Sequence, residues 1–221
     1  MNPRPTHPDT APATGPGAVR SPSAENILRT AAGLFAAHGY AATSTRDIAA
    51  AVGIKQPTLY KHFASKDEIL VALVGLAVHP LADMAERLLD DPAGADVRMC
   101  RWLGAAATHL AESPHSIGSL LISPRQGNSD GFAQVLRRYG RLEADLCELV
   151  AAGQRDGVVA EGEPRSIVRL TLALFDTLAL PETTVEVGEL VAYAMGALLT
   201  DRTRLPAVLA AASEDGPSGR R

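Results

Sequence analysis

The segment from Ser44 to Phe63, STRDIAAAVGIKQPTLYKHF, carries two short helix patterns separated by a single glycine. Ser44 is a favourable N-cap for the first helix, and Asp47 stands three residues later, where a capping box places an acidic side chain. Gly53 permits the left-handed backbone that ends a helix in a sharp turn. Pro57 is compatible with the second helix because it lies in the first turn. Two short helices joined by such a turn are typical of a helix-turn-helix.

Helix patterns also flank this segment on both sides. Ser65 and Glu68 have the spacing of a capping box, which predicts a long helix over residues 67–90 with a kink or break near Pro80. Before the helix-turn-helix, an apolar stripe at helical spacing predicts a helix that ends at Gly39; its residues are Ile27, Ala31, Leu34, Phe35 and His38.

The rest of the chain also has helical periodicity. No alternating strand pattern and no internal repeat is present in the sequence, so we expect an all-α fold. Predicted helices cover residues 95–112, 115–122, 130–156, 164–180 and 184–200. The predicted organisation is a disordered tail (1–20), a three-helix DNA-binding domain (21–81, with the helix-turn-helix at about 44–63), a helical ligand-binding and dimerisation domain (82–205), and a C-terminal tail (206–221).

Composition limits the cellular setting. Of the 221 residues, 46% are hydrophobic, which is enough for a sizeable core. The longest apolar run, Ile69 to Val78, is shorter than the roughly 20 residues that a bilayer requires. Prolines interrupt the N-terminus before any apolar run of a secretion signal forms. Cys100 and Cys147 have neither disulfide nor metal spacing, so we expect buried thiols in a cytoplasmic protein.

Basic side chains are concentrated in one part of the chain. The formal net charge is −4, but residues 21–81 carry five basic and four acidic side chains. Residues 82–221 carry fourteen arginines and twenty acids. The three lysines of the chain, Lys55, Lys61 and Lys66, all lie around the second short helix. A local basic patch matters more for nucleic-acid binding than the overall charge.

The predicted second short helix has one core face and one polar face. Leu59 and Phe63, four residues apart, face the core, and the opposite face carries the amide, hydroxyl and ammonium groups that read base edges in a major groove. Helix N-termini at the two predicted caps attract phosphate. From periodicity alone, an ordinary solvated face remains an equal alternative. The candidate DNA-binding residues are Ser44, Thr45, Arg46, Gln56, Pro57, Thr58, Tyr60, Lys61, His62 and Lys66.

The run from Ile27 to Leu70 resembles the N-terminal domain of tetracycline-repressor (TetR) family regulators. It contains the spaced patterns A..LF...GY, T..DIA...G and TLY.HF.SK..L, although Lys55 replaces a common serine and Pro57 a common glycine. The resemblance implies a repressor that a small molecule releases from a near-palindromic operator. It also implies the roles of individual residues: Gln56, Pro57, Thr58 and Lys61 contact bases, and Thr45, Tyr60, His62 and Lys66 contact the DNA backbone.

The resemblance also implies that the C-terminal region binds a small molecule. Large or polar side chains among many alanines are the pocket candidates, with ordinary core packing as the alternative for Trp102 and Phe175. The candidates are Met99, Trp102, His109, His115, Arg125, Phe132, Tyr139 and Phe175. His79, His109 and His115 lack carboxylate or cysteine partners at metal spacing, so we predict no metal and no cofactor. No nucleophile motif is present, so we expect no enzyme activity.

Two last helices with wide apolar arcs predict a homodimer, because a surface helix ordinarily buries a stripe of about 100°. The alternative is that both helices are central within one subunit. The predicted interface residues are Leu174, Leu178, Val191, Met195 and Leu199. Two functions remain open from the residues: a ligand-responsive transcriptional regulator, or a helical small-molecule-binding protein or enzyme with a vestigial DNA-binding surface. The gathered lysines favour the regulator.

Overall fold

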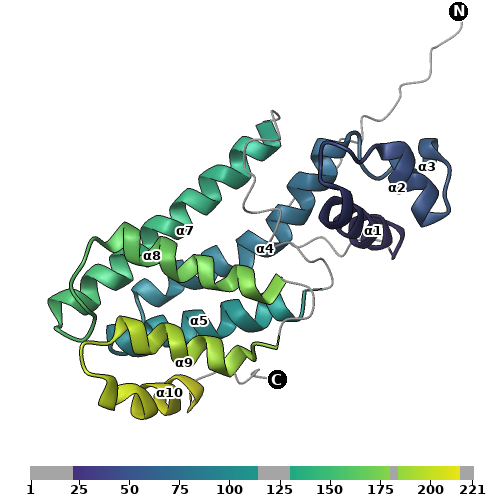
Figure 1. Ribbon diagram of the computed structural model, residues 1–221. Coiled ribbons are helices and arrows are strands. Elements are labelled where there is room, and N and C mark those ends of the chain that lie inside the picture. Colours follow the sequence, from purple (N-terminus) through teal and green to yellow (C-terminus); the bar gives the residue numbers. More distant parts are fainter. Residues whose placement is uncertain (1–21, 114–129, 180–183, 215–221) are drawn as a thin grey trace, which may run out of the picture.

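The computed structural model describes residues 22–113, 130–179 and 184–214, and within these ranges the chain is helical (Figure 1). The predicted all-α class is confirmed. The predicted tail at 1–20 and the predicted helix at 115–122 lie outside the described residues. The elements are α1 (Pro22–His38), α2 (Thr45–Val52), α3 (Gln56–Tyr60), α4 (Lys66–Leu89), α5 (Ala95–Ala111), α7 (Asp130–Arg155), α8 (Pro164–Leu174), η1 (Phe175–Ala179), α9 (Val187–Leu198), η2 (Arg202–Arg204) and α10 (Leu205–Glu214).

Helices α1 to α3 form a small unit at one end of α4 (Figure 1). Their apolar stripes meet in a core with Ile27, Ile48 and Leu59, each fully buried. Phe63 joins this core just after α3. The spacing that predicted inward-facing residues on each short helix therefore matches the packing.

The C-terminal unit is built around α5, which contacts α4, α7, α9 and α10 (Figure 1). Trp102 and Leu103 of α5 are buried at its centre, together with Leu149 of α7 and Met195 of α9. A single antiparallel bridge pair, Val159 with Leu199, links the turn after α7 to the end of α9. Ala106 and Ala107 of α5 are buried beside them, and their small side chains let the neighbouring helices approach closely.

Helix α4 belongs to both cores. Its buried residues before Pro80, such as Leu73 and Val78, pack with the N-terminal unit, whereas Leu81 and Ala85 after it pack with the C-terminal unit. The sequence predicts a kink or a break near Pro80, and the helix runs unbroken from Lys66 to Leu89. By length and composition it would also suit a membrane span, but 56% of its most apolar window is buried inside the protein. The helix is therefore apolar because it packs into two hydrophobic cores.

Several helix ends differ by a few residues from the predicted ones, among them those of α3 and α8. Helix α3 ends at Tyr60 rather than Phe63, because the N–H groups of His62 and Phe63 both donate to the Leu59 carbonyl as the chain turns inward. Helix α8 ends at Leu174, where the Thr177 hydroxyl donates to the Leu174 carbonyl over 2.6 Å and a 3₁₀ segment follows.

Helix α10 covers residues where the sequence analysis expects a tail. An ion pair fixes its start: Arg204 lies 2.7 Å from the Asp96 carboxylate, which is buried on α5. Farther along, Arg101 of α5 donates to the Ala211 carbonyl over 3.5 Å. Both partners lie more than 100 residues away in the chain, which is why local sequence did not reveal the helix.

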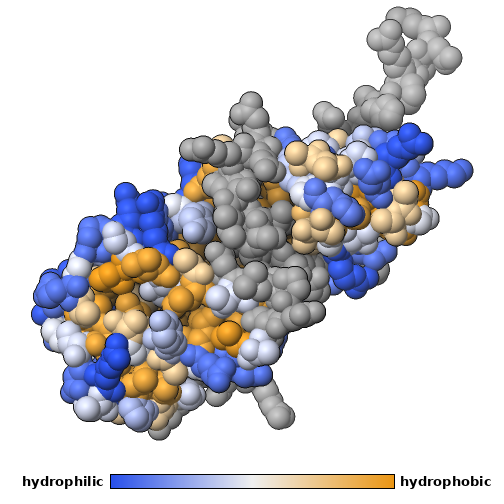
Figure 2. Space-filling model, viewed as in Figure 1, coloured by the Kyte–Doolittle hydropathy of each residue, from blue (hydrophilic) through white to orange (hydrophobic). Residues whose placement is uncertain are grey.

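The structure corrects the predicted dimer interface. Val191, Met195 and Leu199 are buried in their own subunit, and Leu174 and Leu178 are half-buried against the same core. The apolar side chains that remain open on these helices are Leu170 of α8, 72% exposed, and Tyr193 of α9, 70% exposed. Apolar surface is visible over α8 and α9 on the face shown in Figure 2. The arcs are wide because one side faces the core and another side is exposed.

The turn between α2 and α3 generates a stability prediction. Gly53 has a φ of 78°, and its N–H donates to the carbonyls of Ala49 and Ala50. A side chain added here meets open space, so Gly53→Ala introduces only backbone strain, which we expect to lower the free energy of unfolding by about 1–2 kcal/mol. Urea unfolding measures this change.

Gly33 provides the matched control. It lies exposed in the interior of α1 with open space around it and without a positive φ. Gly33→Ala should therefore stabilise the protein by about 0.5–1 kcal/mol, because alanine is the better helix former. Equal effects of the two substitutions would contradict the assignment of the turn to Gly53.

Candidate nucleic-acid interface and effector cavity

Helix α2 starts with a complete capping box. The Ser44 hydroxyl accepts from the Asp47 N–H over 3.2 Å, and the Asp47 carboxylate accepts from the Ser44 N–H over 2.9 Å. The Ser44 hydroxyl also donates to this carboxylate over 2.6 Å. Hydrogen bonds from Ser44 hold the pKa of Asp47 below its usual range. The short aspartate therefore completes the box, and a charged, pre-ordered helix start faces solvent.

Helix α3 presents a polar outer face. Leu59 is fully buried, whereas Pro57, Thr58 and Lys61 are exposed and Tyr60 is 47% exposed. Ser44 and Arg46 are exposed beside it on α2, and Gln56, Thr45 and His62 are half-buried. The structure thus brings nine of the ten predicted DNA-binding side chains to the surface of α2, α3 and the following turn.

Three of these side chains form a hydrogen-bonded group that joins α2 to α3. The Gln56 amide donates to the Thr45 hydroxyl over 3.1 Å and to the Tyr60 hydroxyl over 3.2 Å. The two hydroxyls lie 3.2 Å apart. Because each hydroxyl both donates and accepts, the group keeps capacity for further partners while its geometry is fixed. The sequence analysis identified all three residues but not their mutual contacts.

Lys66 has a role different from the predicted one. Its ammonium donates to the carbonyls of Tyr40 and Thr43, each over 2.7 Å, and lies 4.2 Å from the centre of the Tyr40 ring. These partners direct it toward the loop between α1 and α2 and not toward DNA phosphate. We therefore replace the predicted backbone contact by a structural role, in which Lys66 fixes this loop to the start of α4.

Tyr40 and Thr43 complete this loop. The Tyr40 hydroxyl donates to Asp67, and its ring packs edge-on against Phe35 at a centroid distance of 5.2 Å. Burial and the neighbouring Asp67 raise the pKa of the Tyr40 hydroxyl. The buried Thr43 hydroxyl donates to the Gly39 carbonyl over 2.9 Å. The sequence analysis missed both as partners of Lys66, because contacts over more than twenty residues leave no local pattern.

At the start of α4, the Ser65 hydroxyl accepts from the Glu68 N–H over 3.1 Å, as predicted. Glu68 accepts from the N–H of Ala64 and not from that of Ser65, so the box is displaced by one residue. The helix α4, which carries the DNA-binding unit, therefore begins at an end that is capped by Ser65 and hydrogen-bonded to the preceding loop.

Substitutions of Lys61 and Lys66 should differ in their effect on the stability of the protein. Lys66→Met keeps the aliphatic stem but leaves the Tyr40 and Thr43 carbonyls without their donor, so we expect a loss of about 1–3 kcal/mol in the free energy of unfolding. Lys61→Ala removes an exposed ammonium and should change it by no more than about 0.5 kcal/mol. Urea unfolding of both variants decides the role of Lys66: equal midpoints would contradict the structural assignment.

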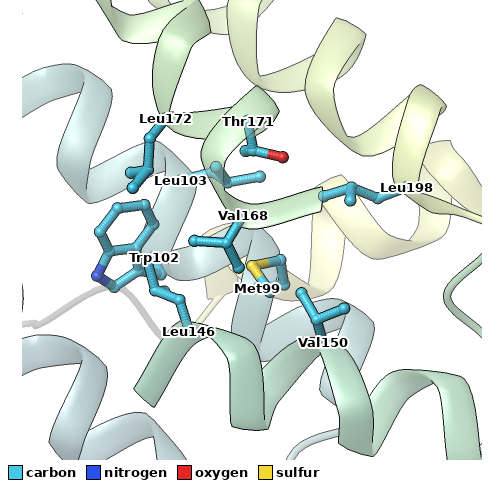
Figure 3. Close-up of a pocket in the computed structure, with 9 residues that line it drawn as sticks. All are labelled: Met99, Trp102, Leu103, Leu146, Val150, Val168, Thr171, Leu172 and Leu198. Carbon is cyan, nitrogen blue, oxygen red and sulfur yellow. The ribbon is translucent and has the colours of Figure 1, made fainter. Parts of the chain in front are cut away.

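A cavity lies in the C-terminal core between α5, α7, α8 and α9 (Figure 3). Its free volume is about 10 Å³, room for roughly one water molecule. Thr171 contributes the one hydroxyl of the lining. The indole N–H of Trp102 is already bonded to the Leu81 carbonyl over 3.0 Å. The lining residues are Met99, Trp102, Leu103, Leu146, Val150, Val168, Thr171, Leu172 and Leu198.

The predicted pocket residues divide into two groups. Met99 and Trp102 line the cavity, and Phe175 packs edge-on against Trp102 at a centroid distance of 6.0 Å. His109 lies instead against α4, and Tyr139 packs against the N-terminal core. His115 and Arg125 lie outside the described residues, as does the side chain of Phe132, although its backbone belongs to α7.

The titratable groups that the structure describes in this region lack the arrangement that a metal ion requires. Among the residues that the structure describes, no group of three or more His, Cys, Asp or Glu side chains is placed to hold a metal ion. Cys100 is buried, which raises the pKa of its thiol to about 11, and burial also raises the pKa of the half-buried Cys147. Both thiols are therefore protonated at neutral pH.

Comparison with known proteins agrees with this geometry. Residues 27–73 match the model of bacterial regulatory proteins of the tetR family. An HTH-type transcriptional repressor of Mycobacterium tuberculosis is 41% identical over 78 residues, which are 35% of this chain and 39% of that protein. The matched part is thus about two-fifths of the length of that relative.

Solved structures extend the likeness to the whole fold. The crystal structure of AmtR from Mycobacterium smegmatis is 30% identical with a TM-score of 0.69, and the likeness covers 91% of this chain and 97% of that one. AibR, crystallised with isovaleryl coenzyme A and operator DNA, is 20% identical with a TM-score of 0.63 over 79% of this chain and 96% of its own. The chain belongs to the TetR family of helix-turn-helix transcriptional regulators.

Proposed function

We propose that this TetR-family regulator is a ligand-responsive repressor that binds a near-palindromic operator as a homodimer and is released by a small molecule. The observation that supports it most is the outer face of α3, where Thr58 and Lys61 are exposed beside the hydrogen-bonded group of Thr45, Gln56 and Tyr60. An internal core explains Leu59 but gives no reason for this set of polar groups on α3 and the residues next to it.

The exposed groups suit distinct parts of a DNA duplex. The Gln56 amide, the Thr58 hydroxyl and the Lys61 ammonium match base edges in a major groove, and Pro57 offers an apolar contact to a thymine methyl group. Thr45, Tyr60 and His62 lie on the flanks, where hydroxyl and imidazole groups reach phosphate oxygens. Positioning contacts and sequence-reading contacts are thus supplied by different faces of the same unit.

Dimerisation through the outer faces of α8 and α9 would supply the second recognition helix. Leu170 and Tyr193 are highly exposed on these two helices, which contact each other. A two-fold axis between such faces pairs each patch with its copy. Two recognition helices then meet successive turns of the major groove, which requires an operator with inverted half-sites.

The cavity chemistry favours an effector that is mainly apolar. Eight of its nine lining side chains carry no free polar group, since the Trp102 N–H is already bonded, and Thr171 offers one hydroxyl. A charged group placed among them would lose its hydration without compensation. AibR was crystallised with an acyl thioester of coenzyme A, and here a short hydrocarbon portion would suit the cavity better than any charged part of such a molecule.

DNA binding is tested with an operator selected by the protein from a randomised duplex library. Lys61→Ala and Thr58→Ala should each weaken operator binding by roughly 1–3 kcal/mol more than binding to random DNA, because a base contact is lost. His62→Ala should weaken both kinds of DNA alike. Fluorescence anisotropy at several salt concentrations measures these affinities.

Arg87→Ala is the control for charge. Arg87 is exposed near the far end of α4, so its loss removes one positive charge without touching the proposed interface. It should leave operator affinity unchanged. The proposal fails if wild-type protein selects no sequence, or if Lys61→Ala and Arg87→Ala behave alike.

The dimer face is tested by light scattering at micromolar concentration. Leu170→Glu and Tyr193→Glu place unpaired charges on the proposed interface and should yield monomers with weakened operator binding and a nearly unchanged unfolding midpoint. Ala210→Glu, on the exposed side of α10, should remain dimeric. A mass of two subunits for both interface variants would show that another face pairs.

A further inference from the structure

Pro80 leaves one carbonyl of α4 without its helical donor. Proline has no N–H, so the carbonyl of Leu76, four residues earlier, lacks its regular α-helical hydrogen bond. The His109 Nε2 atom of α5 lies 3.1 Å from this oxygen. Because a carbonyl only accepts, Nε2 carries the proton of this bond. His109 thus supplies from another helix the hydrogen bond that Pro80 removes.

A second α5 side chain holds α4 on the other side of Pro80. Trp102 lies seven residues before His109, on the same face of α5. Its Nε1–H donates to the Leu81 carbonyl over 3.0 Å. We call this arrangement the Pro80 joint: Pro80, the Leu76 and Leu81 carbonyls, and their donors His109 and Trp102.

The joint lies where α4 passes from one core to the other. The residues of α4 that pack with the DNA-binding unit, from Ile69 to Val78, precede Pro80, and those that pack with α5, from Leu81 to Leu88, follow it. Proline in a helix interior is a common site of bending. The two bonds from α5 therefore hold α4 on both sides of Pro80, in addition to its packing against α7.

Trp102 also forms a wall of the effector cavity (Figure 3). The cavity has about 10 Å³ of free volume, whereas sites for small molecules commonly need about 300 Å³ or more. Lining side chains must therefore move to admit an effector. Trp102 is the largest of them, and it is bonded directly to α4. Its partner Phe175 belongs to the 3₁₀ segment after α8, where the regular helix has already ended.

We propose that the Pro80 joint transmits effector binding to the DNA-binding domains. An effector that displaces Trp102 breaks its bond to Leu81 and leaves α4 free to bend at Pro80. Bending changes the separation of the two recognition helices in the dimer, and the fraction of dimers that match the operator falls with it. This inference rests on the proposed function as a repressor released by a small molecule.

A thermal double-mutant cycle tests the joint without DNA or effector. His109→Leu removes the donor to Leu76 and should lower the melting temperature by about 2–4 °C, the shift that corresponds to one net hydrogen bond in a chain of this size. In Pro80→Ala the helix supplies its own donor to Leu76. His109→Leu in that background should change the melting temperature by less than about 1 °C. Additive effects would overturn the pairing.

Operator affinity tests the regulatory role. We expect His109→Leu to weaken binding to the selected operator at least about 5-fold, and Pro80→Ala/His109→Leu to bind like Pro80→Ala. Trp102→Phe keeps an aromatic ring beside Phe175 but lacks the N–H, and should weaken binding similarly. His79→Leu is the control, because the imidazole of this half-buried histidine of α4 has no hydrogen-bond partner among the described residues. Light scattering verifies that each variant remains a dimer.

The outcomes separate this inference from the proposed function. Wild-type operator binding with unchanged affinity in His109→Leu and Trp102→Phe would overturn the regulatory role of the joint. A wild-type protein that selects no operator would instead refute the proposed function, and the thermal cycle would still decide whether His109 and Pro80 are coupled.

Discussion

The fold depends on a single constraint: helix α4 must satisfy two hydrophobic cores with one continuous backbone. Its apolar residues change partners near Pro80, from the three-helix unit to the helices around Trp102. A helix that packs into two cores must be apolar over most of its length. For this reason the composition of α4 also suits a membrane span. Both the orientation of the DNA-binding unit and any response to an effector are consequences of how α4 is held.

Polar contacts hold α4 at the points where apolar packing alone would permit movement. At its start, Lys66 joins the helix to the carbonyls of Tyr40 and Thr43, and Ser65 caps it. In its middle, His109 and Trp102 bond to carbonyls on both sides of Pro80. Lys66 and His109 satisfy carbonyls that a loop leaves open or that Pro80 deprives of a donor, and Trp102 adds a bond to a carbonyl within the helix. Hydrophobic burial supplies the stability, and these few directed bonds determine the geometry.

The parts predicted from sequence are those encoded by neighbouring residues. Ser44, Gly53 and Pro57 start or end helices through contacts with residues only a few positions away. The helix-turn-helix and its polar outer face were therefore predictable. Caps and turns have strict local geometry, which gives them a recognisable spacing. The all-α class followed from the helical period of the whole chain.

The parts that sequence did not reveal depend on partners far along the chain. Lys66 has the positive charge expected of a residue that contacts phosphate. Only the positions of Tyr40 and Thr43 show that its ammonium group binds carbonyl oxygens of its own domain. Helix α10 depends on the buried Asp96 on α5. Wide apolar arcs on α8 and α9 indicated two buried faces, but periodicity cannot say which face belongs to the subunit's own core, and Met195 was assigned to the wrong one.

Hydroxyl-radical footprinting of the selected operator tests the central claim most directly, because it reports the arrangement of two DNA-binding units held by two α4 helices. The account predicts two equivalent protected regions related by a two-fold axis and centred about one helical turn, roughly 34–36 Å, apart on one face of the duplex. A single protected half-site, or uniform weak protection along the duplex, would contradict it.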